Sequence, residues 1–319
     1  MTRLVLACVL ALGMAPVLPA PAPETAPFLM GVLRRDGFVL PFAAWDGKRW
    51  GTPWPADIRA QDLPIGLEDV PERWWGKPGP QSALVRWADG SKHGTVALER
   101  PVRMPVMCSV RMALRSDYKS KDPLPPPFEQ PFPKDGLLVS GDQTVLALPA
   151  VPRSSSEWSS SAVVLLPEFN KMEDAAIASF TAWRHPVSRG QRARMPIEVE
   201  ALYRVPMDEE GWAAYYIEAI RRYPPGPDDE GCGLVTFASG WIRLGPKGRP
   251  LFDIGARVTY CDRKGAGYML PLGVLTLDGK AFWVYQMSGH DREWYVVARP
   301  TPRAIELHVE YAAGLCPFR

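Results

Sequence analysis

Three side chains near the C-terminus have the types and the spacing of a metal site. Glu306, His308 and Glu310 alternate with apolar residues. On a β-strand, this period of two points all three to one face, where a carboxylate–imidazole–carboxylate cluster could bind a metal ion. The alternative is the solvated outer face of an antiparallel sheet, which is far commoner, and no second histidine lies nearby. The sequence therefore predicts no cofactor and keeps these three residues as the metal candidates.

A second polar group contains the residue types of a hydrolase. Ser288-Gly289-His290-Asp291 is followed closely by Glu293. Near-consecutive residues in a turn cannot aim their side chains at one another as a nucleophilic triad requires. The chain also lacks a Gly-x-Ser-x-Gly elbow and a His-Glu-x-x-His motif. A polar hairpin turn is the simpler interpretation, with His290, Asp291 and Glu293 as catalytic candidates if they flank a cleft.

Tryptophan is concentrated in one part of the chain. Six of the twelve tryptophans lie within residues 45–87, namely Trp45, Trp50, Trp54, Trp74, Trp75 and Trp87. Indole rings exposed on a β surface could stack on sugars or on proline-rich chains. The alternative is core packing, because tryptophan buries a large apolar area. These six residues are the candidate ligand-binding surface.

The N-terminus predicts export. One positive charge at Arg3 precedes the apolar run 4–12, and small residues and prolines follow up to residue 22. This order is typical of a secretory signal peptide, and the run is too short for a membrane span. We expect a periplasmic or secreted protein with no transmembrane segment in the mature chain. The formal net charge of +2 provides no clustered base for nucleic acid.

Four cysteines remain once the signal peptide, with Cys8, is removed: Cys108, Cys232, Cys261 and Cys316. An even number in an exported chain favours two disulfides, and four cysteines allow three pairings. Two strand-like stretches joined by the turn-rich residues 245–248 separate Cys232 from Cys261, so a hairpin brings these two sulfurs together. We therefore predict Cys232–Cys261 and Cys108–Cys316. The alternative is one disulfide and two buried thiols.

The pattern of turns and apolar runs predicts a mainly β fold, with α+β at the margin. Five Asp-Gly dipeptides, which suit tight hairpin turns, punctuate the chain. One helix is expected near 208–223, where acidic residues precede apolar residues at helical spacing and prolines follow. An antiparallel C-terminal meander of about six strands is expected over 234–244, 251–260, 269–277, 281–287, 293–299 and 304–311.

The expected domain organisation follows the composition. The signal peptide spans 1–22, and a Trp-rich β lobe spans 27–122. A Pro/Ser-rich connection spans 123–160 and includes a serine-rich loop at 154–161, and the C-terminal β lobe with its helix spans 161–319. The alternative is a single domain with a long proline-rich excursion, which a Cys108–Cys316 disulfide would favour. The favoured function is non-catalytic binding of a polysaccharide, an envelope component or another extracytoplasmic protein. The alternative is a hydrolase of an extracellular polymer with a carboxylate/His site in the C-terminal lobe.

Overall fold

The computed structural model describes residues 26–52, 82–87, 93–126, 131–141, 143–225 and 232–316. The predicted signal peptide, residues 1–22, lies outside these ranges. The described chain is dominated by antiparallel strands, so the mainly β prediction is confirmed. None of its helices has the length and apolar character needed to span a bilayer.

The N-terminal strands form a small barrel. These strands are β1 (Phe28–Arg34), β2 (Phe38–Trp45), β3 (Trp50–Gly51), β4 (Ser82–Trp87), β5 (His93–Val106), β6 (Ser109–Ser116) and β7 (Lys134–Val139). Their order is β1-β7-β4-β5-β6-β2-β3, and β1 also pairs with β2, so the ring closes. Alternate side chains of the six longer strands, such as Leu33, Val85 and Leu138, form one buried cluster in its interior.

The rest of the chain forms two antiparallel sheets. The four-stranded sheet contains β9 (Glu198–Pro206), β10 (Ala213–Arg222), β11 (Leu234–Leu244) and β12 (Pro250–Tyr260), in the order β12-β11-β10-β9. The five-stranded sheet contains β8 (Val145–Leu146), β13 (Gly267–Leu277), β14 (Lys280–Gly289), β15 (Arg292–Pro300) and β16 (Ile305–Leu315), in the order β16-β15-β14-β13-β8. All six strands of the predicted meander are present, but the meander divides between two sheets after β12.

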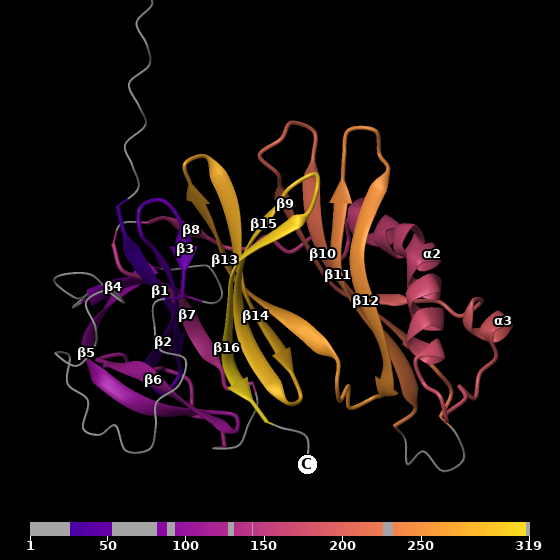
Figure 1. Cartoon of the computed structure of the whole chain (residues 1–319), viewed down its shortest axis with the longest axis horizontal. Helices are drawn as coiled ribbons and strands as arrows, with labels where there is room; N and C mark the ends of the chain where they lie inside the picture. Colours follow the sequence, from indigo (N-terminus) through magenta and orange to yellow (C-terminus); the bar gives the residue numbers. More distant parts are fainter. Residues whose placement is uncertain are drawn as a thin grey trace, which may run out of the picture.

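The barrel, the two sheets and a helix stack in four layers (Figure 1). The outer side of the barrel packs on the five-stranded sheet, where Phe42 stacks on Tyr295 with ring centroids 5.0 Å apart. The opposite face of that sheet packs on the four-stranded sheet through Trp283 and Trp241. Helix α2 (Ser156–Ala178) covers the far face of the four-stranded sheet through Leu165 and Phe169. A short helix, α3 (Arg189–Arg192), follows it.

The helix predicted near 208–223 is wrong, because this segment contains the central strand β10. Both faces of β10 are covered: Tyr216 faces the five-stranded sheet and Ile217 faces α2. A strand that is covered on both faces needs apolar residues at odd and even positions alike. Such a run also contains apolar residues three and four positions apart, which is the spacing of an amphipathic helix. The serine-rich loop predicted at 154–161 is also wrong, because α2 begins there with Ser155 as its N-cap.

The predicted connection, residues 123–160, is part of the packed body. It contributes β7, which lies between β1 and β4 in the barrel, and β8 at the edge of the five-stranded sheet. Both predicted disulfides are confirmed. Cys108–Cys316 joins the turn between β5 and β6 to the end of β16, and Cys232–Cys261 joins the start of β11 to the end of β12.

Candidate functional site

A groove of about 500 Å³ opens at the free edge of the four-stranded sheet, along β12. Its walls come from three parts of the chain: the end of α2, the β11–β12 hairpin, and the segment that enters β13. The side chains used below are Ser179 and Phe180 after α2, Phe237 and Ser239 on β11, Arg257 on β12, and Lys264 before β13.

The strand register explains how the hairpin shapes this groove. Phe237 pairs with Arg257 and Ser239 pairs with Gly255, so these residues point to the same face. A Cβ added at Gly255 would meet no atom within 4 Å. Because β12 has no strand beyond it, the missing side chain at Gly255 leaves an open space beside Ser239.

The groove is basic. Its lining contains Arg257 and Lys264 and, among the described residues, no acidic side chain. Arg257 is exposed and makes no ion pair within the described part of the chain. The Lys264 Nζ lies 3.3 Å from the Asp262 carboxylate, and both side chains are largely exposed. Aromatic surface lies next to these charges, because Phe180 is 45% exposed while Phe237 is buried.

The segment from Cys261 to Met269 forms one wall of the groove and is fixed near both of its ends. Its start is fixed by the Cys232–Cys261 disulfide, and the Arg263 guanidinium lies 2.6 Å from a Glu200 oxygen. Further along, the Ser239 hydroxyl donates to the Gly267 carbonyl oxygen at 3.2 Å. The Met269 N–H donates to the Glu218 carboxylate at 2.6 Å. The wall formed by this segment is therefore fixed before any ligand binds.

Glu218 is the most perturbed carboxylate near the groove. It lies on β10 directly opposite Ser239, and only 6% of it is exposed. Burial raises the pKa of Glu218 to about 7, although the hydrogen bond from the Met269 N–H opposes this rise. Burial also raises the pKa of the neighbouring Tyr216 hydroxyl. Glu218 lies behind the groove wall rather than in the lining.

The catalytic candidates of the sequence have separate environments. His290 is exposed in the turn between β14 and β15. The Asp291 carboxylate accepts a hydrogen bond from Arg292, which lowers the pKa of that carboxyl. Glu293 is buried and forms an ion pair of 2.8 Å with Lys134 of the barrel. Glu293 is therefore engaged in an ion pair between the barrel and the five-stranded sheet, and Asp291 is engaged by its neighbour Arg292.

The metal candidates are divided by a β-bulge. Ala298 pairs with Leu307 and Val297 with Val309, so His308 is the extra residue on β16. The His308 Nε2 lies 3.7 Å from a Glu306 carboxylate oxygen, and the His308 ring contacts the Phe282 ring on the barrel side of the sheet.

Glu310 lies beyond this bulge, on the other side of the sheet. Burial raises the pKa of Tyr285, and the charge of Glu310 adds to that rise. Tyr285 belongs to the cluster that faces the four-stranded sheet. The predicted single-faced triplet is therefore wrong. Within the described ranges, no three His, Cys, Asp or Glu residues are placed to share a metal ion.

The tryptophan candidates do not form a described platform. Trp45 is buried and Trp50 is partly buried, with ring centroids 5.5 Å apart in the core between the barrel and the five-stranded sheet. Trp87 ends β4, and its side chain is outside the described set. Trp54, Trp74 and Trp75 lie outside the described residues.

Sequence reasoning did not identify Glu218, Arg257 or Lys264 as site residues. One available signal was Gly255, a glycine in the middle of a predicted strand, which often marks an open or closely approached position. Comparisons with protein-family models, curated proteins and solved structures give no match to this chain. The functional argument therefore depends on the geometry of the groove.

Proposed function

We propose that this is an exported protein that binds, without catalysis, a component of the cell envelope or the extracellular medium in the groove along β12. The observation that carries the proposal is the groove itself: a cavity of about 500 Å³ has the size of a small-molecule site. Its lining combines cationic, hydroxyl and aromatic side chains, which can both orient and bury a ligand.

The covalent framework supports the extracytoplasmic part of the proposal. Two disulfides are typical of proteins that fold in an oxidising compartment. The positions of the catalytic candidates support binding rather than hydrolysis, because Glu293 serves in a buried ion pair and His290 lies in an exposed turn. The tryptophan cluster is not part of the proposal, since Trp45 and Trp50 pack in the core.

A substitution that fills the groove tests the binding function. Gly255→Trp places an indole in the open space, and Gly190→Trp is the matched control, because an added Cβ meets nothing within 4 Å at either glycine. Ligand-observed NMR is recorded with naphthoate, naphthylmethanol and naphthylmethylammonium as probes. We expect at least one probe to bind the wild type and Gly190→Trp but not Gly255→Trp. Absence of binding by all three probes, or equal binding by Gly255→Trp, would refute the proposal.

Export is tested on the full chain expressed in a Gram-negative host. We expect the product in the periplasm, shortened near residue 22, with no thiol free to react with a maleimide. An unprocessed product in the cytosol with reduced cysteines would refute the extracytoplasmic assignment.

A further inference from the structure

We infer that the groove ligand is a small organic anion with an aromatic or other flat apolar body, whose acid group is bound by Arg257 and Lys264. This inference rests on the proposed binding function and names the ligand class for the same groove. It is carried by three features of the lining: the sign of its charges, its aromatic surface and the free space at Gly255.

The charges of the lining favour an anion. Arg257 and Lys264 are its ionic side chains, and both are basic. A guanidinium presents paired donors that match a carboxylate or a sulfonate, whereas an ammonium adds a point charge. Asp262 lies beside Lys264 and accepts a hydrogen bond from the Lys264 backbone N–H at 3.1 Å, but its side chain is 42% exposed, so water screens its attraction for the ammonium.

Two other negative features lie near the groove, and both are weakened. Glu218 lies behind Ser239, and its raised pKa leaves it only partly ionised at neutral pH. The C-terminal end of α2 also carries partial negative charge. There, the Ser179 N–H and hydroxyl and the Phe180 N–H donate to the carbonyls of residues 175–177, which satisfies these acceptors. Asp262 matches the charge of Lys264, so Arg257, which forms no ion pair among the described residues, gives the groove its net positive charge.

Two phenylalanines in the groove lining determine where the apolar part of the ligand can lie. Phe237 is 2% exposed and forms part of the floor, while Phe180 is 45% exposed at the mouth. The Phe237 ring is covered, with the Arg263 guanidinium 5.2 Å from its centroid, whereas the exposed Phe180 ring provides a surface on which a flat body can stack. Ala176 and Ala266 also line the groove, and their small side chains leave room for it.

The test compares three probes of matched shape and different charge. Naphthoate, naphthylmethanol and naphthylmethylammonium are titrated by calorimetry into the purified, oxidised protein. We expect naphthoate to bind at least about tenfold tighter than the neutral alcohol, and the ammonium probe to bind most weakly, because a partly desolvated charge pair adds to the aromatic contact. The naphthoate affinity should fall as salt screens the pair.

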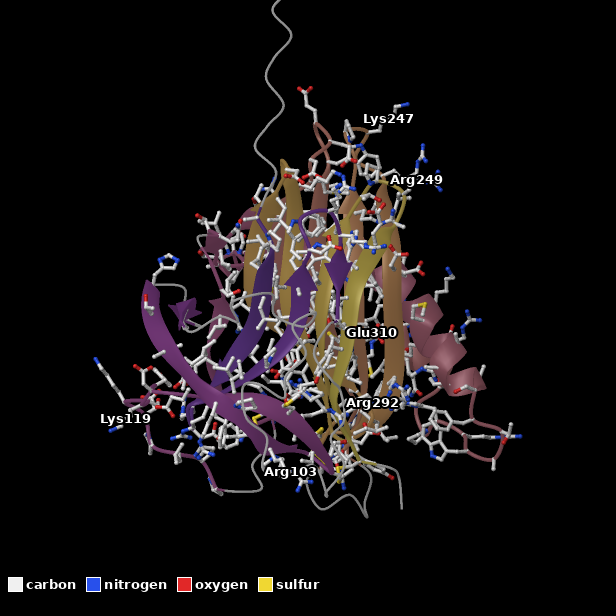
Figure 2. All side chains as sticks on the ribbon, turned by 60° about the vertical axis from the view of Figure 1, so that its left-hand side comes forward. Arg103, Lys119, Lys247, Arg249, Arg292 and Glu310 are labelled. Atoms are coloured by element: carbon white, nitrogen blue, oxygen red, sulfur yellow. A yellow bond between two sulfur atoms is a disulfide. The ribbon has the colours of Figure 1, made fainter. Side chains whose placement is uncertain are left out.

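Arg257→Gln should raise the naphthoate Kd by about tenfold and leave the naphthylmethanol Kd unchanged. Arg249→Gln is the matched control: it removes the same charge from an exposed site on the turn of the same hairpin. Figure 2 shows Arg249 and Arg292 toward opposite ends of the stacked sheets. A Cβ added at Gly289 would lie 3.4 Å from the Ala266 carbonyl oxygen and 3.5 Å from the Arg292 side chain, so Arg292 marks the end of the sheets near the groove wall, away from Arg249.

The outcomes separate the two proposals. Tight naphthoate binding that depends on Arg257 and not on Arg249 supports the inference. Binding of the alcohol or the ammonium probe at least as tight as that of naphthoate, lost in Gly255→Trp, overturns the anion assignment and leaves the binding function intact. Absence of binding by all three probes overturns both.

Discussion

Glu218 is almost completely buried in the sheet interior, and its carboxylate has a single backbone donor. Its carboxylate accepts the Met269 N–H, and so it joins the four-stranded sheet to the first residues of β13. Because burial outweighs that hydrogen bond, the folded protein favours the neutral acid at a pH where the unfolded chain is ionised. Protonation of Glu218 therefore makes the free energy of unfolding depend on pH.

Glu218→Gln should remove this link while keeping an acceptor for the Met269 N–H. A folded pKa of about 7 against an ordinary 4.5 means that the stabilising effect of the neutral acid is complete below pH 4.5 and is lost as the pH rises toward 7. The wild type should lose up to about 3 kcal/mol relative to the variant over this window. Urea unfolding at several pH values measures the difference. Parallel pH curves for the two proteins would show that Glu218 is ionised in the fold.

Glu293, one of the catalytic candidates of the sequence, has a structural role through its ion pair with Lys134. Both side chains are less than 10% exposed, and the Tyr295 hydroxyl donates to the same carboxylate at 2.6 Å. Burial lowers the pKa of Lys134, while the charge of Glu293 opposes this. The pair joins the barrel to the five-stranded sheet, so each charge depends on the other for its compensation.

Lys134→Met should destabilise the fold by about 3–5 kcal/mol, because it leaves a buried carboxylate without its cation. Lys134→Met/Glu293→Gln should recover most of this loss, because it also removes the buried negative charge. Lys171→Met is the exposed control, paired with Glu168 at 3.1 Å, and should cost less than about 1 kcal/mol. Chemical denaturation measures all three. A double variant as unstable as the single one would contradict this account.

At the level of elements, the hairpin that carries the groove could be predicted from its own residues. The expected strands 234–244 and 251–260 correspond to β11 and β12, and the turn between them also determined the choice of disulfide. Local apolar runs and turn residues were sufficient because the two strands are adjacent in sequence. By contrast, the residues of β10 alone predict a helix, because the coverage of this strand on both faces depends on α2 and the five-stranded sheet.

The groove could not be predicted in the same way. Phe180 follows α2, Arg257 lies on β12, and Ala266 precedes β13, so no local pattern relates them. The bulge at His308 is a further example, since a single unpaired residue reverses which face Glu310 occupies. Long-range packing determines both features.

Helix α2 depends on one buried carboxylate for the position of its C-terminal half. Glu173 accepts from Arg221 at 2.7 Å and from Arg192 at 3.1 Å, and it also accepts from Tyr223. Arg221 is fully buried. This network attaches the helix to β10 and α3 close to the residues that form one wall of the groove.

Glu173→Ala should therefore release the end of α2 before the rest of the fold. It leaves the fully buried Arg221 guanidinium without a carboxylate, whereas Arg192 keeps its ion pair of 2.9 Å with Asp174, so we expect a loss of about 3–5 kcal/mol. Hydrogen exchange should accelerate in the second half of α2, and naphthoate binding should weaken. Glu168→Ala, which removes a carboxylate from an exposed ion pair on the same helix, is the control. Unchanged exchange at residues 173–178 in Glu173→Ala would contradict the assigned role.

At the scale of the whole molecule, the two disulfides act over different distances. Cys108–Cys316 spans 208 residues and joins the barrel to the last strand of the five-stranded sheet. Cys232–Cys261 spans 29 residues within one hairpin and lies at the start of the groove wall. The first therefore limits separation of the layers, whereas the second fixes one local segment.

Removing each disulfide should separate these two effects. The chain-entropy model predicts a loss of about 5 kcal/mol for Cys108→Ala/Cys316→Ala and about 4 kcal/mol for Cys232→Ala/Cys261→Ala. The closeness of these values makes binding the more discriminating measurement. Cys232→Ala/Cys261→Ala should weaken naphthoate binding at a temperature where the protein is still folded, because the wall that carries Lys264 loses its anchor. Cys108→Ala/Cys316→Ala should leave that binding unchanged below its own unfolding transition. Equal effects of the two variants on binding, measured by calorimetry below both transitions, would mean that the groove responds to the stability of the whole fold rather than to its own hairpin.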